Sequence, residues 1–170
     1  IGIKILESPH LLGRKASDAR SIHFENVELE PIFRINNADK QAASVNAAII
    51  SSGCLGIGSA AFNYAKKYAQ ERQTFGVPIA KHQAISFMMA EMSTDLAAGL
   101  MMIYRLLESI SGKHNNWQLA LFTQTFTLGM ISEMTINAVQ IFGGYGYTKD
   151  YPVEKLMRDA KTYRSFYCYQ

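Results

Sequence analysis

The sequence predicts a mainly α protein: an antiparallel four-helix bundle preceded by a short β segment. Residues 41–70 contain no proline and are rich in alanine, a composition that favours helix. Between residues 83 and 111 apolar side chains recur at helical spacing. The connections between the long segments are short and carry glycine, proline and asparagine, which is typical of antiparallel helices that are neighbours in space.

The β segment is expected near the N-terminus. In residues 21–29 apolar and polar side chains alternate, with Ile22 and Phe24 in phase and one slip after them. This pattern predicts a strand with one buried face. Ile3 and Ile5 are candidates for a second strand.

Four helices are expected to follow, and glycine, asparagine and proline mark their ends. Residues 112–116 (Gly-Lys-His-Asn-Asn) separate the second from the third, Gly143 and Gly144 end the third, and Pro152 lies in the first turn of the fourth. The predicted helices span residues 41–70, 83–111, 117–142 and 153–163.

Residues 41–64 carry no charge and are long enough to cross a membrane. Several serine and asparagine side chains interrupt them, and their apolar residues are mostly alanine, so we expect a mean hydropathy too low for a span. We therefore predict a buried bundle helix without a transmembrane span. Its glycines, Gly53, Gly56 and Gly58, are interpreted as packing notches.

Charge and composition argue against several classes of protein. The formal net charge is +3 and no basic run exceeds Lys66–Lys67, so the sequence shows no basic cluster of the kind that binds nucleic acid. Cys54 and Cys168 are too few for a disulfide framework. No histidine or cysteine pair has metal-ligand spacing, so we predict no metal site.

Two segments between helices could bind a ligand. Residues 71–79 place Arg72 and Thr74 in a turn that Gly76 and Pro78 are expected to form, and an arginine donates paired hydrogen bonds to phosphate. The alternative is a helix end at which Arg72 compensates the dipole.

The second segment is residues 140–147, where three glycines in four positions allow a ligand to approach the backbone closely. It lacks the dinucleotide fingerprint, and a helix cap with a loop is the alternative. In a third segment, Glu154 and Arg158 have the i,i+4 spacing of an ion pair on an exposed helix face.

Together these segments resemble the acyl-CoA dehydrogenase family. The stretches that carry the resemblance are YAKKYAQERQTFGVPIAKHQAISFMMAEM and AVQIFGGYGYTKDYPVEKLMRDAK. The amino-acid sequences of these stretches are most similar to the medium-chain branch of the family. The stretch GRKASDARSIHFENVEL resembles the end of that family's middle β-domain. The resemblance thus divides the chain into a remnant of the middle β-domain, residues 1–35, and a C-terminal helical bundle domain, residues 40–170.

The resemblance implies an FAD site that is shared across a dimer interface. Arg72 and Thr74 would contact the pyrophosphate, and His82 and Gln83 would lie near the same cofactor. The adenosine end would meet Gln140, Ile141, Phe142, Gly143 and Gly144.

The chain departs from the family pattern where the chemistry is expected. Counting from the Arg-Asp-Ala-Lys motif places Tyr167 where the medium-chain branch has its glutamate base, and Cys168 where glycine follows it. A phenol titrates near 10, far above a carboxylate, so it is a poor base at neutral pH. The alternative base position of other branches holds Asn46. The positions of the medium-chain acyl-CoA anchors hold Ala43, Ser44 and Ala47.

Three hypotheses follow. The first is a catalytically degenerate family member, kept as a structural or assembly subunit of a larger complex in the mitochondrial matrix. The second is a truncated fragment of a functional FAD-dependent medium-chain acyl-CoA dehydrogenase. The third is an unrelated bundle with an accidental resemblance. The first two imply protein partners through the bundle, as a homo-oligomer or larger complex, and acyl-CoA binding only if the protein is active.

Overall fold

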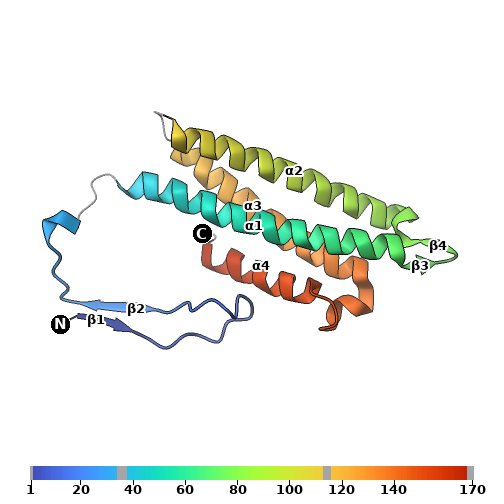
Figure 1. The fold of residues 1–170 in the computed structure, drawn as a ribbon, viewed down its shortest axis with the longest axis horizontal. Coiled ribbons are helices and arrows are strands. Elements are labelled where there is room, and N and C mark those ends of the chain that lie inside the picture. The colour runs from blue at the N-terminus through green and yellow to red at the C-terminus, as the bar shows by residue number, and fades with distance from the viewer. Residues whose placement is uncertain (1, 34–37, 113–115, 168–170) are drawn as a thin grey trace.

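The computed structural model describes residues 2–33, 38–112 and 116–167. Four long helices form an antiparallel bundle, and a two-stranded hairpin with a long connection lies beside it (Figure 1). The predicted fold class, mainly α with a short β part, is confirmed. The helices are α1 (Ala38–Glu71), α2 (Gln83–Ser111), α3 (Trp117–Phe142) and α4 (Val153–Tyr167).

Short elements connect the helices. Strands β3 (Gln73–Thr74) and β4 (Val77–Pro78) and the 3₁₀ turn η2 (Ile79–Lys81) join α1 to α2, and η3 (Gly143–Tyr147) leads from α3 towards α4. Both connections lie at the same end of the bundle (Figure 1). At the opposite end, Asn116 Oδ1 accepts a hydrogen bond of 3.2 Å from the amide of Leu119 and caps the start of α3.

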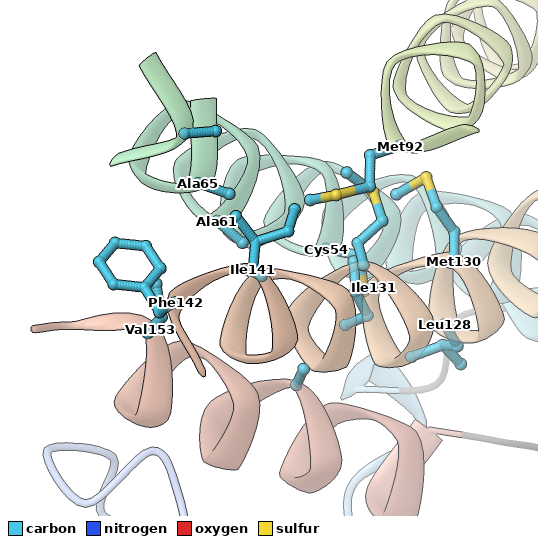
Figure 2. Close-up of a cluster of buried hydrophobic side chains, with 14 of the residues drawn as sticks. Cys54, Ala61, Ala65, Met92, Leu128, Met130, Ile131, Ile141, Phe142 and Val153 are labelled. Atoms are coloured by element: carbon cyan, nitrogen blue, oxygen red, sulfur yellow. The ribbon is translucent and has the colours of Figure 1, made fainter. Parts of the chain in front are cut away.

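The core lies between α1 and α3, with α2 and α4 on either side (Figure 2). Helix α1 contributes mainly small residues to it, such as Cys54, Ala61 and Ala65. Larger side chains from the facing helices, including Met92 of α2 and Ile131 of α3, pack in the same cluster (Figure 2). Small residues let the helix backbones approach closely, which explains why an alanine-rich helix with weak amphipathic character occupies the centre of the bundle.

At two of the three helix glycines, the absence of a side chain lets a neighbouring side chain pack against the helix backbone, as expected of a packing notch. A Cβ added at Gly53 would lie 2.9 Å from the Tyr163 hydroxyl, and one at Gly58 would lie 3.3 Å from the Met134 sulfur. At Gly56 an added Cβ meets no atom within 4 Å, so that prediction was wrong within the described chain.

The hairpin differs from its prediction. Strands β1 (Gly2–Ile5) and β2 (Ile22–Glu25) pair antiparallel, as the two apolar patterns suggested. However, β2 ends before residue 26, where Asn26 adopts a positive φ of 47°. The expected buried face is absent among the described residues, since Phe24 is 63% exposed and Ile22 is exposed too. No described element covers the hairpin.

Helix α4 and the apolar pattern of α2 also differ from expectation. Helix α4 continues to Tyr167, one turn beyond the predicted end. Pro152 precedes α4, and its carbonyl accepts a hydrogen bond of 3.0 Å from the amide of Leu156. In α2, Met92 and Ile103 are buried whereas Phe87 is 63% exposed, so the apolar pattern only partly faces the core.

The connection between β1 and β2 is fastened to α4. The amide of Gly13 donates to Thr162 Oγ1 at 3.1 Å, and the amide of Arg14 donates to Asp159 Oδ1. Arg158 forms the predicted ion pair with Glu154, at 2.8 Å. It also donates to the carbonyl of Leu12 at 2.9 Å. The pair is therefore partly buried beneath this connection instead of lying on an open helix face.

Residues 40–71 form a helix long and apolar enough to cross a membrane, with a mean hydropathy of 1.5 over their most apolar 18 residues. This value is higher than the serine and asparagine content led us to expect. The same helix packs against α2, α3 and α4 in the bundle, and the core helix of a soluble protein can be equally long and apolar. The absence of a transmembrane span therefore stays a prediction.

Candidate functional site

A hollow of about 520 Å³ opens at the end of the bundle where α1 ends and α3 passes into η3. Two segments far apart in the sequence form its walls, the hairpin after α1 and the glycine segment after α3. The lining residues are Tyr68, Arg72, Thr74, Ile79, Ile141, Phe142, Gly143, Gly144, Tyr145 and Thr148.

A tight hairpin fixes one wall. The amide of Arg72 continues the helical hydrogen bonding to the carbonyl of Tyr68, at 2.8 Å, and the carbonyl of Arg72 accepts from the amide of Ile79, also at 2.8 Å. Phe75 and Gly76 form the turn, with φ values of 52° and 78°. Two successive positive φ values indicate a type I′ turn, which matches the twist of a two-residue hairpin.

This hairpin corrects the sequence interpretation in one respect. Pro78 does not shape the turn; it lies in β4, where it pairs with Gln73. The turn therefore depends on Gly76 together with a strained Phe75, whose side chain is 98% exposed.

Thr74 is held by a histidine behind the hollow. Its Oγ1 lies 2.8 Å from Nε2 of His82, and the Phe75 ring meets the His82 ring edge-on at 6.3 Å. His82 itself does not line the hollow. It is the residue that precedes α2, and its amide donates to the carbonyl of Ile79 at 3.0 Å. His82 thereby orients the threonine hydroxyl at the edge of the hollow.

The glycine segment forms the opposite wall. Gly143 has φ 59° and ψ −134°, a conformation that L side chains rarely adopt. A Cβ added at Gly146 would lie 2.6 Å from the carbonyl oxygen of Val139, so the segment folds back tightly on α3. At Gly143 and Gly144 an added Cβ would meet no atom within 4 Å. The backbone of this segment is therefore accessible from the hollow.

Aromatic rings support the floor. Tyr68 stacks on Phe142 with ring centroids 4.2 Å apart and an interplanar angle of 18°. Tyr151 packs against both rings and against Tyr145. This cluster joins the end of α1 to the end of α3, so the two walls are fixed relative to each other.

Six of the nine predicted cofactor residues line this hollow. His82 lies behind it, and Gln83 and Gln140 are exposed and do not line it. The predicted residues in the lining are Arg72, Thr74, Ile141, Phe142, Gly143 and Gly144.

Sequence reasoning missed Tyr68, Ile79, Tyr145 and Thr148. A signal existed for Tyr68, which lies four residues before Arg72 and hence on the same side of the chain at the end of α1. Ile79 and Tyr145 lie within the two segments singled out above, residues 71–79 and 140–147, but are not among the predicted binding residues. Thr148 carries no comparable signal, since only the folding of the second connection brings it here.

Arg72 is the one charged residue among those that line the hollow. The remaining polar groups are hydroxyls and backbone groups, all neutral. An arginine beside accessible backbone and aromatic rings suits a ligand with an anionic part and a planar or apolar part. Among the described residues, no group of three or more histidine, cysteine or acidic side chains could hold a metal ion.

The two candidate base positions lie elsewhere. The hydroxyl of Tyr167 accepts a hydrogen bond of 3.1 Å from Nη1 of Arg14, whose guanidinium lies 4.5 Å from the ring centroid of Tyr163. The hydrogen bond to Tyr167 raises the pKa of Arg14 above its ordinary value. Asn46 is exposed on α1. Cys168 lies outside the described residues.

The positions compared with acyl-CoA anchors are packing residues. Ser44 and Ala47 are buried in α1, and Ser44 Oγ donates to the carbonyl of Lys40 at 3.0 Å. Ala43 is half-buried. None of the three lines the hollow. In the described chain these side chains are too small, and too deeply placed in two cases, to hold a ligand.

The model of the family described as "Acyl-CoA dehydrogenase, C-terminal domain" matches residues 37–166. Among curated relatives, a cyclohexane-1-carbonyl-CoA dehydrogenase of Syntrophus aciditrophicus is 32% identical over 97% of this chain and 44% of its own length. An acyl-CoA dehydrogenase of Bacillus subtilis is 34% identical over 94% of this chain and 44% of its own length. The chain therefore spans less than half the length of these relatives.

A caffeyl-CoA reductase–Etf complex subunit of Acetobacterium woodii is 31% identical over 95% of this chain and 44% of its own length. Among solved structures, butyryl-CoA dehydrogenase of Megasphaera elsdenii has a TM-score of 0.86 and 27% identity, covering 97% of this chain and 45% of that one. Matches of this extent rule out the hypothesis of an accidental resemblance. These four relatives are bacterial, and they do not point to a medium-chain branch in particular.

Proposed function

The chain belongs to the acyl-CoA dehydrogenase family through its C-terminal domain, and we propose that it provides part of an FAD site but no catalytic base. In this proposal it acts as a structural or assembly subunit. The observation that carries the proposal is the hollow in which Arg72, Thr74 and the glycine segment converge. The family expectation of FAD supports the choice of ligand.

The residues of the hollow fit the cofactor. The pyrophosphate of FAD is anionic, and Arg72 is the one cation of the lining. The open space beside Gly143 and Gly144 leaves room for a ligand close to the backbone. The aromatic and aliphatic side chains of the lining, such as Tyr145 and Ile141, match the apolar surface of a nucleotide ring.

Each of these residues has a distinct task. Arg72 binds and orients the anionic part, while Thr74, fixed by its 2.8 Å contact with His82, supplies a positioned hydroxyl. When bound, the flavin of FAD supplies hydride acceptance. Gln83 and Gln140 are exposed and do not line the hollow. They would contact an FAD held by a neighbouring subunit, or one in this hollow after a rearrangement, and their role stays a prediction.

Two observations support the absence of a base. Acyl-CoA oxidation by this family requires a carboxylate that removes a proton, and both expected positions carry other residues, Tyr167 and Asn46. Tyr167 is also engaged by Arg14 through its hydroxyl and by Gln124, which donates to its backbone carbonyl at 2.7 Å. These two contacts of Tyr167 hold the end of α4 in place. They bring no carboxylate to this position that could accept a proton.

The second candidate is a working medium-chain acyl-CoA dehydrogenase of which this chain is a part. The curated dehydrogenases that match nearly the whole chain at 32–34% identity favour it. It requires a carboxylate supplied from outside these 170 residues. The resemblance of residues 64–92 to the medium-chain branch suggests an acyl chain near eight carbons as the substrate to try.

The test is a flavin absorbance spectrum of the protein purified from its natural source with its partners, followed by addition of octanoyl-CoA. We expect bound flavin that octanoyl-CoA does not bleach. Bleaching would establish the working dehydrogenase instead. A protein that carries no flavin, and takes none up from added FAD, would overturn the proposed cofactor site.

A substitution at Arg72 tests the site directly. Arg72→Ala removes a charge-assisted contact to the pyrophosphate, which corresponds to about 1.5–3 kcal/mol. We expect FAD affinity to fall by at least about tenfold in a flavin fluorescence titration. Arg105→Ala is the matched control, since Arg105 is exposed on α2, does not line the hollow and pairs with Glu108. Equal affinity of the two variants would remove Arg72 from the site.

The partners and location are further parts of the proposal. The structural role implies partner subunits bound through the helical bundle, in a homo-oligomer or a larger complex, and we place that complex at the mitochondrial matrix. A description of one relative as an Etf-complex subunit supports the idea of assembly with other proteins. Cell fractionation followed by native gel electrophoresis tests both parts, and recovery as a monomer outside mitochondria would contradict them.

A further inference from the structure

A second region of the molecule is shaped to receive a ligand. Two hollows, of about 550 and 620 Å³, lie between the β1–β2 connection and the first half of α4. They adjoin each other because Lys15 and Arg158 line both. None of their lining residues belongs to the hollow proposed for FAD. We call this pair of hollows the α4 groove.

The walls of the α4 groove are fixed before any ligand binds. Residues 12–14 are held on α4 by the hydrogen bonds to Arg158, Thr162 and Asp159 described above. Gly13 is buried against the helix so closely that an added Cβ would overlap the Arg158 carbonyl. This anchoring places the next residue, Lys15, over the groove. The backbone beside Lys15 is therefore ordered in advance, and binding has to order only the exposed lysine side chains.

The charge of the α4 groove is strongly positive. Five cationic side chains line it against two carboxylates, an excess of three that equals the formal net charge of the whole chain. The two carboxylates are already paired, Glu154 with Arg158 at 2.8 Å and Asp159 with Lys155 at 2.7 Å. The five cations are Arg14, Lys15, Lys149, Lys155 and Arg158.

Lys15 and Lys149 have no ion pair or hydrogen bond within residues 2–33, 38–112 and 116–167. The hydrogen bond from Arg158 lowers the pKa of Glu154, and the charges of Lys149 and Lys15 lower it further. Both ammonium groups therefore lie within electrostatic reach of the Glu154 carboxylate. His10 lines the same hollow as a further donor. Two ammonium groups that form no ion pair within the described residues thus line one concave surface, together with the Glu154 carboxylate that is paired with Arg158.

We propose that the α4 groove binds a phosphate dianion, either inorganic phosphate or a phosphate monoester, held by Lys15 and Lys149 beside Arg158. A phosphate monoester carries close to two negative charges at neutral pH, and its oxygens accept several charge-assisted hydrogen bonds. A carboxylate would neutralise only one of the two lysines. The dianion is either inorganic phosphate or the phosphate monoester of a nucleotide, and the hollows, of about 550 and 620 Å³, have room for both.

The experiment is isothermal titration calorimetry of the full chain with inorganic phosphate and, separately, with AMP, at low ionic strength. We expect phosphate to bind, and Lys15→Gln and Lys149→Gln each to weaken binding by about tenfold, since each removes one charge-assisted hydrogen bond. AMP that binds more tightly than phosphate, with adenosine inactive and with AMP binding weakened in Lys15→Gln and Lys149→Gln, assigns the phosphate of the α4 groove to a nucleotide. Equal affinities for the two assign it to the free anion.

Controls distinguish binding in the α4 groove from non-specific electrostatic attraction of anions to the protein. Lys66→Gln removes the same charge from α1, lines neither hollow, and is expected to change the affinity by less than about twofold. Acetate at equal ionic strength is expected not to bind. Lys15 and Lys149 are both exposed, so their variants should keep the circular dichroism spectrum and melting temperature of the wild type.

The proposal is overturned if phosphate and AMP both fail to bind, or if Lys66→Gln weakens binding as much as Lys15→Gln. It is also overturned if acetate competes with phosphate at equal concentration. The flavin spectrum is independent of all these outcomes, so failure of the α4 groove and failure of the FAD site are distinguishable.

Discussion

At the scale of single residues, two neighbouring glycines have different tasks in the candidate cofactor site. Gly143 adopts a positive φ that closes α3 and turns the chain into η3, whereas Gly144 has no positive φ. Both line the hollow, and an added Cβ at either meets open space. The difference between them is therefore backbone conformation alone, which gives a matched pair for experiment.

We expect Gly143→Ala to lower the free energy of unfolding by about 1–3 kcal/mol, because alanine is strained at this φ and ψ. Gly144→Ala should change it by less than about 0.5 kcal/mol. Urea denaturation followed by circular dichroism measures both. Equal stability of the two variants would show that the backbone conformation of Gly143 is not required.

Cys54 lies in the core beside a small polar layer. Thr127 Oγ1 donates to Ser51 Oγ at 3.1 Å in the same layer. Burial raises the pKa of the Cys54 thiol to about 12, against a smaller opposing effect of a hydrogen bond with Thr127. The folded chain therefore keeps this thiol protonated at a pH where the unfolded chain ionises it.

The raised pKa has a consequence for stability at high pH. Between the ordinary thiol pKa, about 8.5, and the folded value, the folded state binds more protons than the unfolded state, so stability falls as pH rises. We expect wild type to lose more stability than Cys54→Ala between pH 8 and 11, measured by denaturant titration at each pH. Parallel losses in the two proteins would contradict the raised pKa.

In Cys168→Ser, we expect Cys54 to react with a thiol reagent at pH 8 only after unfolding.

At the scale of elements, α4 depends on contacts that come from distant segments. Its last turn is joined to α3 by Gln124 and to the β1–β2 connection by Arg14, which explains why it continues beyond the predicted end. Its middle is covered by residues 12–14. The connection and the helix therefore form one unit although nearly the whole length of the chain separates them.

Gly13→Ala should break this unit. The added methyl group would overlap the backbone of Arg158 and force the connection away from α4, at a cost of about 1–3 kcal/mol. In this variant we expect faster amide hydrogen exchange at residue 13 and at Arg14 than in the wild type. The control is Gly56→Ala in α1, where the added Cβ meets no atom within 4 Å and helix propensity should stabilise the protein by up to about 1 kcal/mol. Unchanged exchange in Gly13→Ala would show that the contact is not tight in solution.

At the scale of the whole molecule, stability is distributed unevenly. The α1–α3 interface holds most of the buried side chains, whereas the β1–β2 hairpin is exposed on both faces in the described structure. A two-stranded hairpin without a covering layer is marginally stable in water. The bundle is therefore expected to persist where the hairpin opens.

Native-state hydrogen exchange tests this distribution. Amides of β1 and β2 should exchange through local opening, while those at the centre of α1 and α3 should exchange only on global unfolding. A deletion of residues 1–11 should leave the protection of α3 unchanged. Protection of the hairpin equal to that of α3 would mean that another part of the protein, or a partner, covers it.

The sequence by itself determined the fold class, the four helices and most of the candidate site. Helical periodicity, alanine content and glycine at the ends act locally, so α2 and α3 have the predicted bounds. Local chemistry also singled out Arg72 and the glycine segment, because phosphate recognition and close backbone approach need particular residue types.

Only the tertiary structure decided which residues meet. It placed Tyr68 and Thr148 in the hollow, moved His82 behind it, and left Gln83 and Gln140 outside, because these outcomes depend on how two remote connections fold against each other. The exposed face of β2 and the extra turn of α4 have the same origin. Periodicity identifies an apolar face or a helix, but whether another segment covers that face or caps that end depends on long-range packing that no local pattern encodes.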